Sequence, residues 1–403
     1  MNKALISFVC FFALACAGLS AQSFSWSWAS TGGSINSDDC TGISVDAGNN
    51  IYVTGRFNNT AVFGATTLVT TGGFDVYVGK LDAGGTWQWV VKAGGTDSDY
   101  ATDIETDANG YSYVTGYFQA TATFGATVLT SAGGYEAYIA KLDPSGNWLW
   151  AVKGGGTQYD AGNGISIDGS GNCYATGYFA GTATFGATVL TSSGGDDVFV
   201  AKLDANGNWQ WAVKGGWVNY ESAYRITTDS AGTSYVTGYF SGVSYFGSNN
   251  VSAYNGADAY VAKIDSGGTW VWARRVAGGL YTDESMCAAT DASGNIYVTG
   301  YFSGTAYFGS GTLTSVGYED LFVVKYNPNG EWQWAKQAGS TGNDTHGQGI
   351  ALNSGGEISV TGYFRGTAVF GGVSLASSGN KDIFAAKMDA SGNWVDAVKA
   401  GAN

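Results

Sequence analysis

Tyr113-Val-Thr-Gly-Tyr-Phe118 is one of six near-identical phrases in this chain, and their regular return predicts the fold. The glycines of the phrases stand at positions 55, 116, 177, 238, 300 and 362, so the spacing is 61 or 62 residues. A period this regular is typical of one supersecondary unit used repeatedly, with each copy burying its apolar face against the next. The 403 residues are therefore expected to form one large array. The six phrases are Tyr52–Phe57, Tyr113–Phe118, Tyr174–Phe179, Tyr235–Phe240, Tyr297–Phe302 and Ser359–Phe364.

Each repeat has the pattern of four β-strands joined by short turns. In the second repeat, residues 103–107, 111–118, 137–143 and 148–153 have strand length and a β-branched or aromatic composition. Turns such as Asp168-Gly-Ser-Gly-Asn172 lie between strands, where Asp caps the turn and Gly takes the positive φ. Calcium binding is the alternative for Asp-rich turns, but these turns lack the alternating acids of a calcium loop. A segment of about 20 residues with a Phe-Gly pair separates the second and third strands and predicts an added hairpin.

Tryptophan pairs of the form Trp-x-Trp occur once per repeat, in its last strand. Residues i and i+2 of a strand share a face, so each pair is expected to form one aromatic surface between neighbouring units. Thirteen of the 14 tryptophans belong to this series, and Trp217 does not. A lysine also recurs in the third strand, where it is expected to be part of the scaffold. These lysines are Lys80, Lys141, Lys202, Lys263, Lys325 and Lys387.

These patterns predict an all-β fold, a six-bladed β-propeller with four-stranded blades that each carry a small added hairpin, over residues 24–403. We expect the N-terminal strand, Ser25-Trp-Ser-Trp28, to complete the sixth blade and close the ring. Asp396 stands where the other copies have Trp, so the segment from 393 onward is expected to be displaced. The alternative is a truncated seven-bladed propeller.

The repeat resembles a known family. Asp-x-x-Gly-Asn-x-Tyr-Val-Thr-Gly-Tyr-Phe, followed by Val-Ala-Lys-Leu-Asp-x-x-Gly and Trp-x-Trp-Ala, is similar to the SBBP-type β-propeller repeat of bacterial secreted and surface proteins. The phrase from Asn295 to Gly309 carries the resemblance best, and the resemblance extends over 26–400. It implies a propeller of seven blades, whereas six complete copies are present, and it brings no shared catalytic residues.

The start of the chain has the features of an export signal. Lys3 is followed by an apolar run from 4 to 14, and Leu19-Ser-Ala21 fits a cleavage site, which predicts a signal peptide over 1–21 and a secreted or cell-surface protein. Cys16 leaves a lipoprotein alternative open. No later segment is long and apolar enough to span a membrane.

The composition of the chain limits the classes of partner that it can bind and the disulfides that it can form. The net charge is −14 with 18 Lys and Arg, which argues against nucleic acid because few cations are present to neutralise phosphates. The three cysteines after the signal are odd in number and out of phase with the repeat, so free thiols are expected. These cysteines are Cys40, Cys173 and Cys287.

No catalytic motif is present, so the chain is expected not to be an enzyme and to need no cofactor or metal. His346 is the single histidine, which excludes a multi-histidine metal centre, and no nucleophile elbow accompanies it. A carbohydrate-active hydrolase or lyase on the same scaffold remains the alternative, because the spacing of carboxylate pairs in space is not readable from sequence.

Two sets of residues are candidate ligand contacts. Acids that precede the first strand of each blade are expected to ring one mouth of the channel as a site for a cation or cationic ligand, or alternatively to bond backbone N–H groups. Loop residues that depart from the repeat are expected to lie on one face near that mouth, where aromatics suit a sugar or a protein partner. The acids are Asp38, Asp99, Asp160, Glu221, Asp283 and Asp344, and the loop residues are Trp217, Asn219, Tyr220, Tyr281 and His346.

The predicted function is that of a secreted or cell-surface binding module, acting as a monomer on a glycan or a surface protein. A purely structural adhesin or surface component is a further alternative.

Overall fold

The computed structural model describes residues 25–401, and every regular element in that range is a β-strand. Within this range there is no helix with the length and apolar character needed to cross a membrane. The predicted signal peptide lies outside the described residues.

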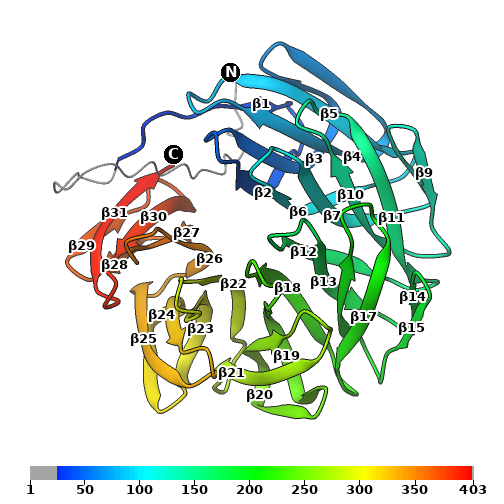
Figure 1. Cartoon of the computed structure of the whole chain (residues 1–403). Helices are drawn as coiled ribbons and strands as arrows, with labels where there is room; N and C mark the ends of the chain where they lie inside the picture. Colours follow the sequence, from blue (N-terminus) through cyan, green and yellow to red (C-terminus); the bar gives the residue numbers. More distant parts are fainter. Residues whose placement is uncertain (1–24, 402–403) are drawn as a thin grey trace.

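Each sequence repeat forms a four-stranded antiparallel unit whose strands run in chain order from the centre of the molecule to its periphery (Figure 1). The units follow one another around a central axis, as the blades of a propeller do, so the predicted all-β, propeller-like fold is confirmed. From the centre outward, the first blade consists of β2 (Asp39–Val45), β3 (Ile51–Phe63), β4 (Thr66–Leu81) and β5 (Trp87–Gly95), and the second of β6 (Tyr100–Thr106), β7 (Ser112–Phe118), β10 (Glu136–Leu142) and β11 (Trp148–Gly156). The third blade consists of β12 (Ala161–Ile167), β13 (Cys173–Phe179), β16 (Asp197–Leu203) and β17 (Trp209–Gly216), and the fourth of β18 (Glu221–Thr228), β19 (Ser234–Phe246), β20 (Asn249–Ile264) and β21 (Trp270–Ala277). The fifth blade consists of β22 (Glu284–Thr290), β23 (Ile296–Phe308), β24 (Gly311–Tyr326) and β25 (Trp332–Ser340), and the sixth of β26 (Thr345–Leu352), β27 (Ile358–Phe364), β30 (Asp382–Met388) and β31 (Trp394–Ala400).

The Phe-Gly segments form the predicted hairpins, and the hairpins also join neighbouring blades. In the second blade the hairpin pairs with the outer strand of the first blade, with Gly94 opposite Thr123 and Gly95 opposite Ala122. In the first, fourth and fifth blades the hairpin is a continuation of the second and third strands, with a shift in the strand register where it begins. The separate hairpins are β8 (Thr121–Phe124) with β9 (Thr127–Thr130), β14 (Thr182–Phe185) with β15 (Thr188–Thr191), and β28 (Thr367–Phe370) with β29 (Val373–Ala376).

The core lies between the blades, as the tryptophan series predicted, but the two tryptophans of a pair face opposite sides. Trp148 packs with the residues between the first and second blades, whereas Trp150 packs with those between the second and third. The strand register shifts opposite the pair, because Lys141 is paired with Trp150 while the next residue, Leu142, is paired with Trp148. The expected single aromatic surface per pair is therefore wrong, since a β-bulge breaks the two-residue alternation.

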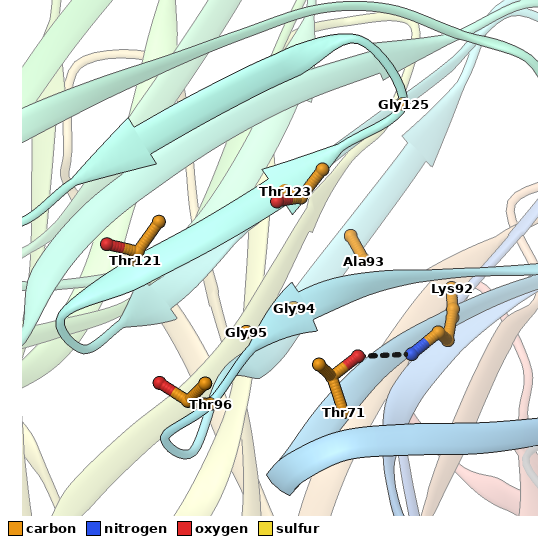
Figure 2. A pocket seen from close by; sticks show the side chains of 9 residues that line it. All are labelled: Thr71, Lys92, Ala93, Gly94, Gly95, Thr96, Thr121, Thr123 and Gly125. Carbon is orange, nitrogen blue, oxygen red and sulfur yellow. Dashed lines mark hydrogen bonds between the residues drawn. The ribbon is translucent and has the colours of Figure 1, made fainter.

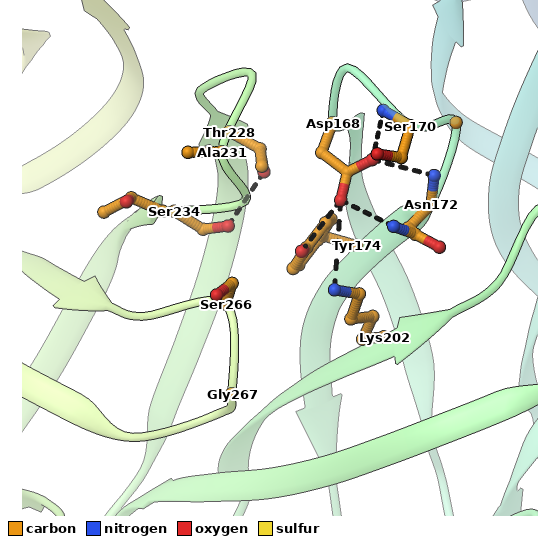
Figure 3. A network of polar contacts seen from close by, with 12 residues as sticks. Asp168, Ser170, Asn172, Tyr174, Lys202, Thr228, Ala231, Ser234, Ser266 and Gly267 are labelled. Atoms are coloured by element: carbon orange, nitrogen blue, oxygen red, sulfur yellow. Dashed lines mark hydrogen bonds and ion pairs between the residues drawn. The ribbon is translucent and has the colours of Figure 1, made fainter.

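The recurring lysine and tyrosine belong to the scaffold, as Figure 3 shows for the third blade. The Asp168 carboxylate accepts hydrogen bonds from the backbone of its own turn and from the Tyr174 hydroxyl at 3.2 Å. The Lys202 ammonium lies 3.9 Å from that carboxylate and 4.9 Å from the centre of the Tyr174 ring. The aspartates of these turns thus have protein partners, which supports the capping role over calcium binding.

The N-terminal strand does not complete the sixth blade, so this part of the closure prediction is wrong. β31 pairs with β30 through the whole last segment and is the outer strand of its own blade. The N-terminal segment lies beyond it: Trp26 donates its indole N–H to the carbonyl of Lys399 at 2.9 Å, and β1 (Gly32–Gly33) pairs with the first blade. Residues 25–33 therefore bridge the last blade and the first across the open side of the array (Figure 1).

The sixth blade differs from the others on the face that looks toward this open side. In the first five blades a tyrosine of the second strand contacts a tryptophan of the outer strand, with ring centres 6.0 to 6.2 Å apart. In the sixth blade Ser359 and Asp396 occupy these two positions, both only partly buried. The sixth blade therefore lacks, at these two positions, the aromatic pair that the other five blades bury.

Candidate functional site

Most of the acids predicted to ring the channel mouth are buried and bound to backbone N–H groups. Asp99, Asp160, Glu221 and Asp283 have no exposed surface. Asp99 is representative, since its two carboxylate oxygens accept from the N–H groups of Gly95 at 2.7 Å and Gln119 at 3.3 Å. These carboxylates hold the loop between two blades, so the alternative reading of the series is the correct one.

The two ends of the acid series differ from its middle. Asp38 makes the same type of backbone contacts, to Ser34 and Asn58, but is only partly buried. Asp344 is one residue out of phase with the other acids of the series, because the equivalent position is that of Thr345, the buried first residue of β26. The Asp344 side chain instead lies 4.0 Å from the Arg365 guanidinium.

The predicted loop aromatics are exposed but do not form one cluster. Trp217, Tyr220 and Tyr281 are 46%, 61% and 58% exposed. Trp217 packs on the hairpin of the fourth blade, with its ring centre 5.1 Å from that of Tyr245. Tyr281 lies beside Gly304 of the next hairpin, so these aromatics mark separate points on the rim. Asn219 donates its amide N–H to the carbonyl of Ser241 and serves the loop itself.

His346 is part of a buried network, which contradicts its placement as a loop residue in contact with ligand. It lies in β26, is 7% exposed, and stacks on Tyr301 with ring centres 4.0 Å apart. Its Nε2 is 2.5 Å from a carboxylate oxygen of Glu319 and its Nδ1 is 2.7 Å from the hydroxyl of Tyr363. Both ring nitrogens are therefore occupied by protein partners.

The structure reveals a tyrosine series at the end of the axis where the loops between blades enter the inner strands. The fifth residue of each repeated phrase is half-buried there, opposite the start of the neighbouring inner strand, as in the pairing of Tyr100 with Tyr117. Burial raises the pKa of Tyr117 to about 12, and the nearby Tyr100 and Tyr178 add to the shift. We call this series the tyrosine arc, formed by Tyr117, Tyr178, Tyr239, Tyr301 and Tyr363, with Arg56 at the first position.

Aromatic rings widen the tyrosine arc over the second blade. Tyr100 stacks on Tyr117 at 4.7 Å, Tyr135 contacts Tyr117 at 5.1 Å, and Tyr159 contacts Tyr135 at 5.7 Å. Tyr159 is 60% exposed, so this aromatic surface reaches from the axis to solvent. A contiguous row of half-exposed rings is a surface on which an apolar sugar face or a partner side chain can stack.

Asp196 lies within the arc and has no hydrogen bond or ion pair from its carboxylate among residues 25–401. Burial raises the pKa of Tyr178, and the charge of Asp196 is the next largest cause of that shift. Asp196 also adds to the raised pKa of Tyr239. Burial likewise raises the pKa of Asp196 itself. Asp196 lies at the junction of the third and fourth blades, because it directly precedes Asp197, which is paired with Phe179, and its carbonyl accepts from the N–H of Glu221 at 2.9 Å.

The sequence shows the residues of the tyrosine arc, but their regular repetition makes them look like part of the scaffold. The fifth residue of the phrase is Tyr in five copies and Arg in the first, and this regularity favours a scaffold role when read from sequence. Strand alternation could not separate this position from the buried Thr two residues earlier, because residues i and i+2 share a face. Only the structure shows that Thr115 is buried while Tyr117 is half-buried.

A groove of about 570 Å³ on the rim is a weaker candidate (Figure 2). It lies between the end of β5 and the hairpin β8–β9, and threonine and glycine residues line most of it. Its one charged group, Lys92, is bound to the hydroxyl of Thr71 at 2.8 Å and to the carboxylate of Asp75 at 2.7 Å. The groove offers no free charged group and no aromatic ring among its lining residues.

No family model matches this chain. It is 28% identical over 486 residues to an uncharacterized WD repeat-containing protein of Acanthamoeba polyphaga mimivirus, across 92% of this chain and 34% of that protein. The regulatory protein FlaEY of Caulobacter vibrioides is 32% identical over 100 residues, which are 24% of this chain and 10% of that protein. The chain thus spans about a third of the length of the first relative.

Solved structures with a similar fold are distant in sequence. A protein of unknown function from Bacteroides caccae has a TM-score of 0.38 and 10% identity, over 74% of this chain and 82% of that chain. A NanB sialidase variant from Streptococcus pneumoniae has a TM-score of 0.35 and 10% identity, over 91% of this chain and 61% of that chain. These similarities are too distant to indicate an activity for this chain.

Proposed function

We propose that this chain is a binding module of an exported or cell-surface protein, and that its ligand lies across the tyrosine arc. The contiguous aromatic surface from Tyr100 to Tyr159 carries this proposal, because it combines stacking faces with exposed phenol groups. The predicted signal peptide and the resemblance to the SBBP-type repeat support the exported location.

The ligand class that fits this surface best is a glycan. Sugar rings present an apolar face that stacks on tyrosine and hydroxyl groups that bond to phenols and carboxylates. Asp196, with its free carboxylate beside Tyr178 and Tyr239, can accept hydrogen bonds from such hydroxyls. A hydrolase is less well supported, because the acids expected at the mouth are bound to backbone N–H groups.

The test is binding of the purified chain to a glycan array, followed by titration calorimetry with each oligosaccharide that binds. Tyr135→Ala combined with Tyr159→Ala should weaken binding at least tenfold, since stacked aromatics contribute most at such surfaces. Tyr307→Ala is the matched control, because Tyr307 is 46% exposed on a hairpin and contacts Tyr254 outside the arc. The proposal fails if no glycan binds or if the double variant binds as tightly as the control.

We also infer that the six blades occupy six of seven positions around the axis. The bond from Trp26 to the Lys399 carbonyl matches the bond from Trp148 to the Lys92 carbonyl, which links consecutive outer strands. By this equivalence, residues 25–33 are the outer strand of a seventh position. Replacing Trp26 and Trp28 by alanine tests this arrangement, because their indoles bond to the last and the first blade.

A further inference from the structure

The chain fills aromatic sites at both ends of the tyrosine arc with its own cations. In the first blade the Arg56 guanidinium lies 4.6 Å from the ring centre of Phe74 and 4.8 Å from that of Tyr100, and is paired with the Asp39 carboxylate. In the sixth blade the Lys381 ammonium lies 3.9 Å from the ring centre of Tyr363. Both contacts have the geometry of cation–π interactions.

Asp196 occupies the position in its repeat that Phe74 and Lys381 occupy in theirs. Here the chain supplies a carboxylate next to the pairing of Asp197 with Phe179, the residue after Tyr178. The Asp196 carbonyl accepts from the N–H of Glu221, which is paired with Phe240, the residue after Tyr239. The chain supplies no cation at this position among the described residues. In the fifth blade the equivalent acid, Glu319, is instead paired with His346. Asp196 is thus an acid of the arc without a cationic partner from the described chain, and it differs from Glu284, whose carboxylate accepts the Tyr224 hydroxyl at 2.8 Å, because its own carboxylate has no hydrogen bond there.

Small side chains next to this position leave it open. The inner-strand residue that pairs with the tyrosine of the arc is Tyr100, Glu284 or His346 in three of the blades. In the third and fourth blades it is Ala161 and Ser222, both buried. No long side chain of this series therefore reaches over the junction of the third and fourth blades.

We propose that the Asp196 position, with Tyr178 and Tyr239, binds the ammonium group of an amino sugar, so that the ligand is a polysaccharide with free amino groups. This inference rests on the proposed function, because the sugar rings are the part that stacks on the flanking exposed rings, Tyr159 and Tyr220. An ammonium gains both a charge-assisted hydrogen bond to the carboxylate and contact with the aromatic faces. The net charge of −14 favours a cationic polymer over an anionic one.

The experiment compares two oligosaccharides of equal length that differ only at nitrogen: β-1,4-linked glucosamine and its fully N-acetylated form. Titration is carried out below neutral pH, where the amine is charged. The wild-type chain should bind the free amine form about tenfold more tightly or better, and added salt should reduce this preference. Asp196→Asn should remove the preference while leaving the affinity for the acetylated form within about twofold.

Two controls separate the outcomes. Glu331→Gln removes an exposed acid from the turn before β25 and should keep the preference. A thermal melt of Asp196→Asn that matches the wild type shows that the variant is folded. Equal binding of both sugars by the wild type overturns the inference but keeps the proposed function, whereas binding of neither overturns both. Binding of an arginine-rich peptide without either sugar would overturn the assignment to an amino sugar.

Discussion

Arg225 ties the inner strands of four blades together from within the axis. It lies in β18 of the fourth blade, and its guanidinium donates to the carbonyls of Asn163 at 2.7 Å and Thr41 at 3.1 Å, in the third and first blades. Its Nε is 3.7 Å from the Asp103 carboxylate of the second blade. Burial raises the pKa of Asp103, and the positive charge of Arg225 opposes that shift. One side chain therefore stabilises contacts across the channel that no repeat pattern specifies.

Arg225→Ala should lower the free energy of unfolding by about 1–3 kcal/mol, because it leaves two carbonyls without this donor and a buried carboxylate without its cation. Arg225→Lys should recover less than half of the loss, since an ammonium cannot reach all three acceptors together. Urea unfolding followed by tryptophan fluorescence measures both values. A loss below about 0.5 kcal/mol for the alanine variant would show that the axial contacts contribute little.

Tryptophans inside and outside the periodic series should differ sharply in their effect on stability. Trp150 packs against Tyr113 between two blades and bonds to the carbonyl of Ala205, so Trp150→Ala should cost about 3–5 kcal/mol. Trp217→Ala should cost under about 1 kcal/mol, because Trp217 is 46% exposed. Chemical denaturation of the two variants in parallel makes the comparison, and equal losses would contradict the assignment of core and rim.

At the scale of the elements, the junction between two blades contains buried carboxylates that retain protons near neutral pH. Burial raises the pKa of Asp99, Glu221 and Asp283 to about 7 and that of Asp160 to about 6. A second acid in the same junction adds to each shift, as Asp75 does for Asp99. The loops that position the tyrosine arc are therefore held by groups whose charge depends on pH.

The free energy of unfolding should consequently decrease as the pH rises from about 5 to about 8. Each of these carboxyls has a higher pKa in the folded than in the unfolded chain, so its stabilising effect is present at low pH and is lost as the pH rises through 6 to 7. The summed change should exceed about 2 kcal/mol. Thermal melts across this range measure it.

Asp99→Asn combined with Asp283→Asn is the matched variant for this prediction. It removes two of the titrating groups, so its stability should vary less with pH than that of the wild type. A melting temperature that is higher at pH 8 than at pH 5 in the wild type would contradict the assigned direction of the pKa shifts.

At the scale of the whole molecule, the N-terminal segment joins the two ends of the array. The Trp26 indole N–H bonds to the Lys399 carbonyl of the last blade, while Trp28 bonds to the Ala83 carbonyl of the first and lies over Gly85. Trp26 and Trp28 thus contact two different blades, as Trp148 and Trp150 do. Trp26→Ala combined with Trp28→Ala should lower the melting temperature by several degrees and should speed hydrogen exchange first in β2 and β31. Unchanged exchange in these two strands would contradict the bridging role.

The polar residues Ser359 and Asp396 on the sixth blade should prevent one molecule from packing onto another through this blade. Ser359→Tyr combined with Asp396→Trp would recreate on the sixth blade the aromatic pair that the other five blades bury. This double variant should self-associate more strongly than the wild type in sedimentation experiments, because it exposes a large apolar patch. Ser359→Thr with Asp396→Asn is the control and should behave as the wild type does. Identical sedimentation of both variants would show that this face is already covered.

The sequence by itself determined the period, the four strands of each repeat, the added hairpin and the burial of the tryptophans between units. These features are local or periodic, since strand composition, turn chemistry and spacing act within one repeat and recur in every copy. The capping role of the turn aspartates followed for the same reason, because Asp168 bonds to residues two and four positions away.

The tertiary structure decided everything that depends on how one repeat meets the next. The bulge that turns Trp148 and Trp150 to opposite faces is a property of strand pairing, and the bridge from Trp26 to Lys399 joins residues 373 positions apart. The tyrosine arc and the free carboxylate of Asp196 arise because successive blades bring equivalent positions to one end of the axis. Such contacts depend on distances between chain segments that are remote in sequence, and no pattern within a repeat encodes those distances.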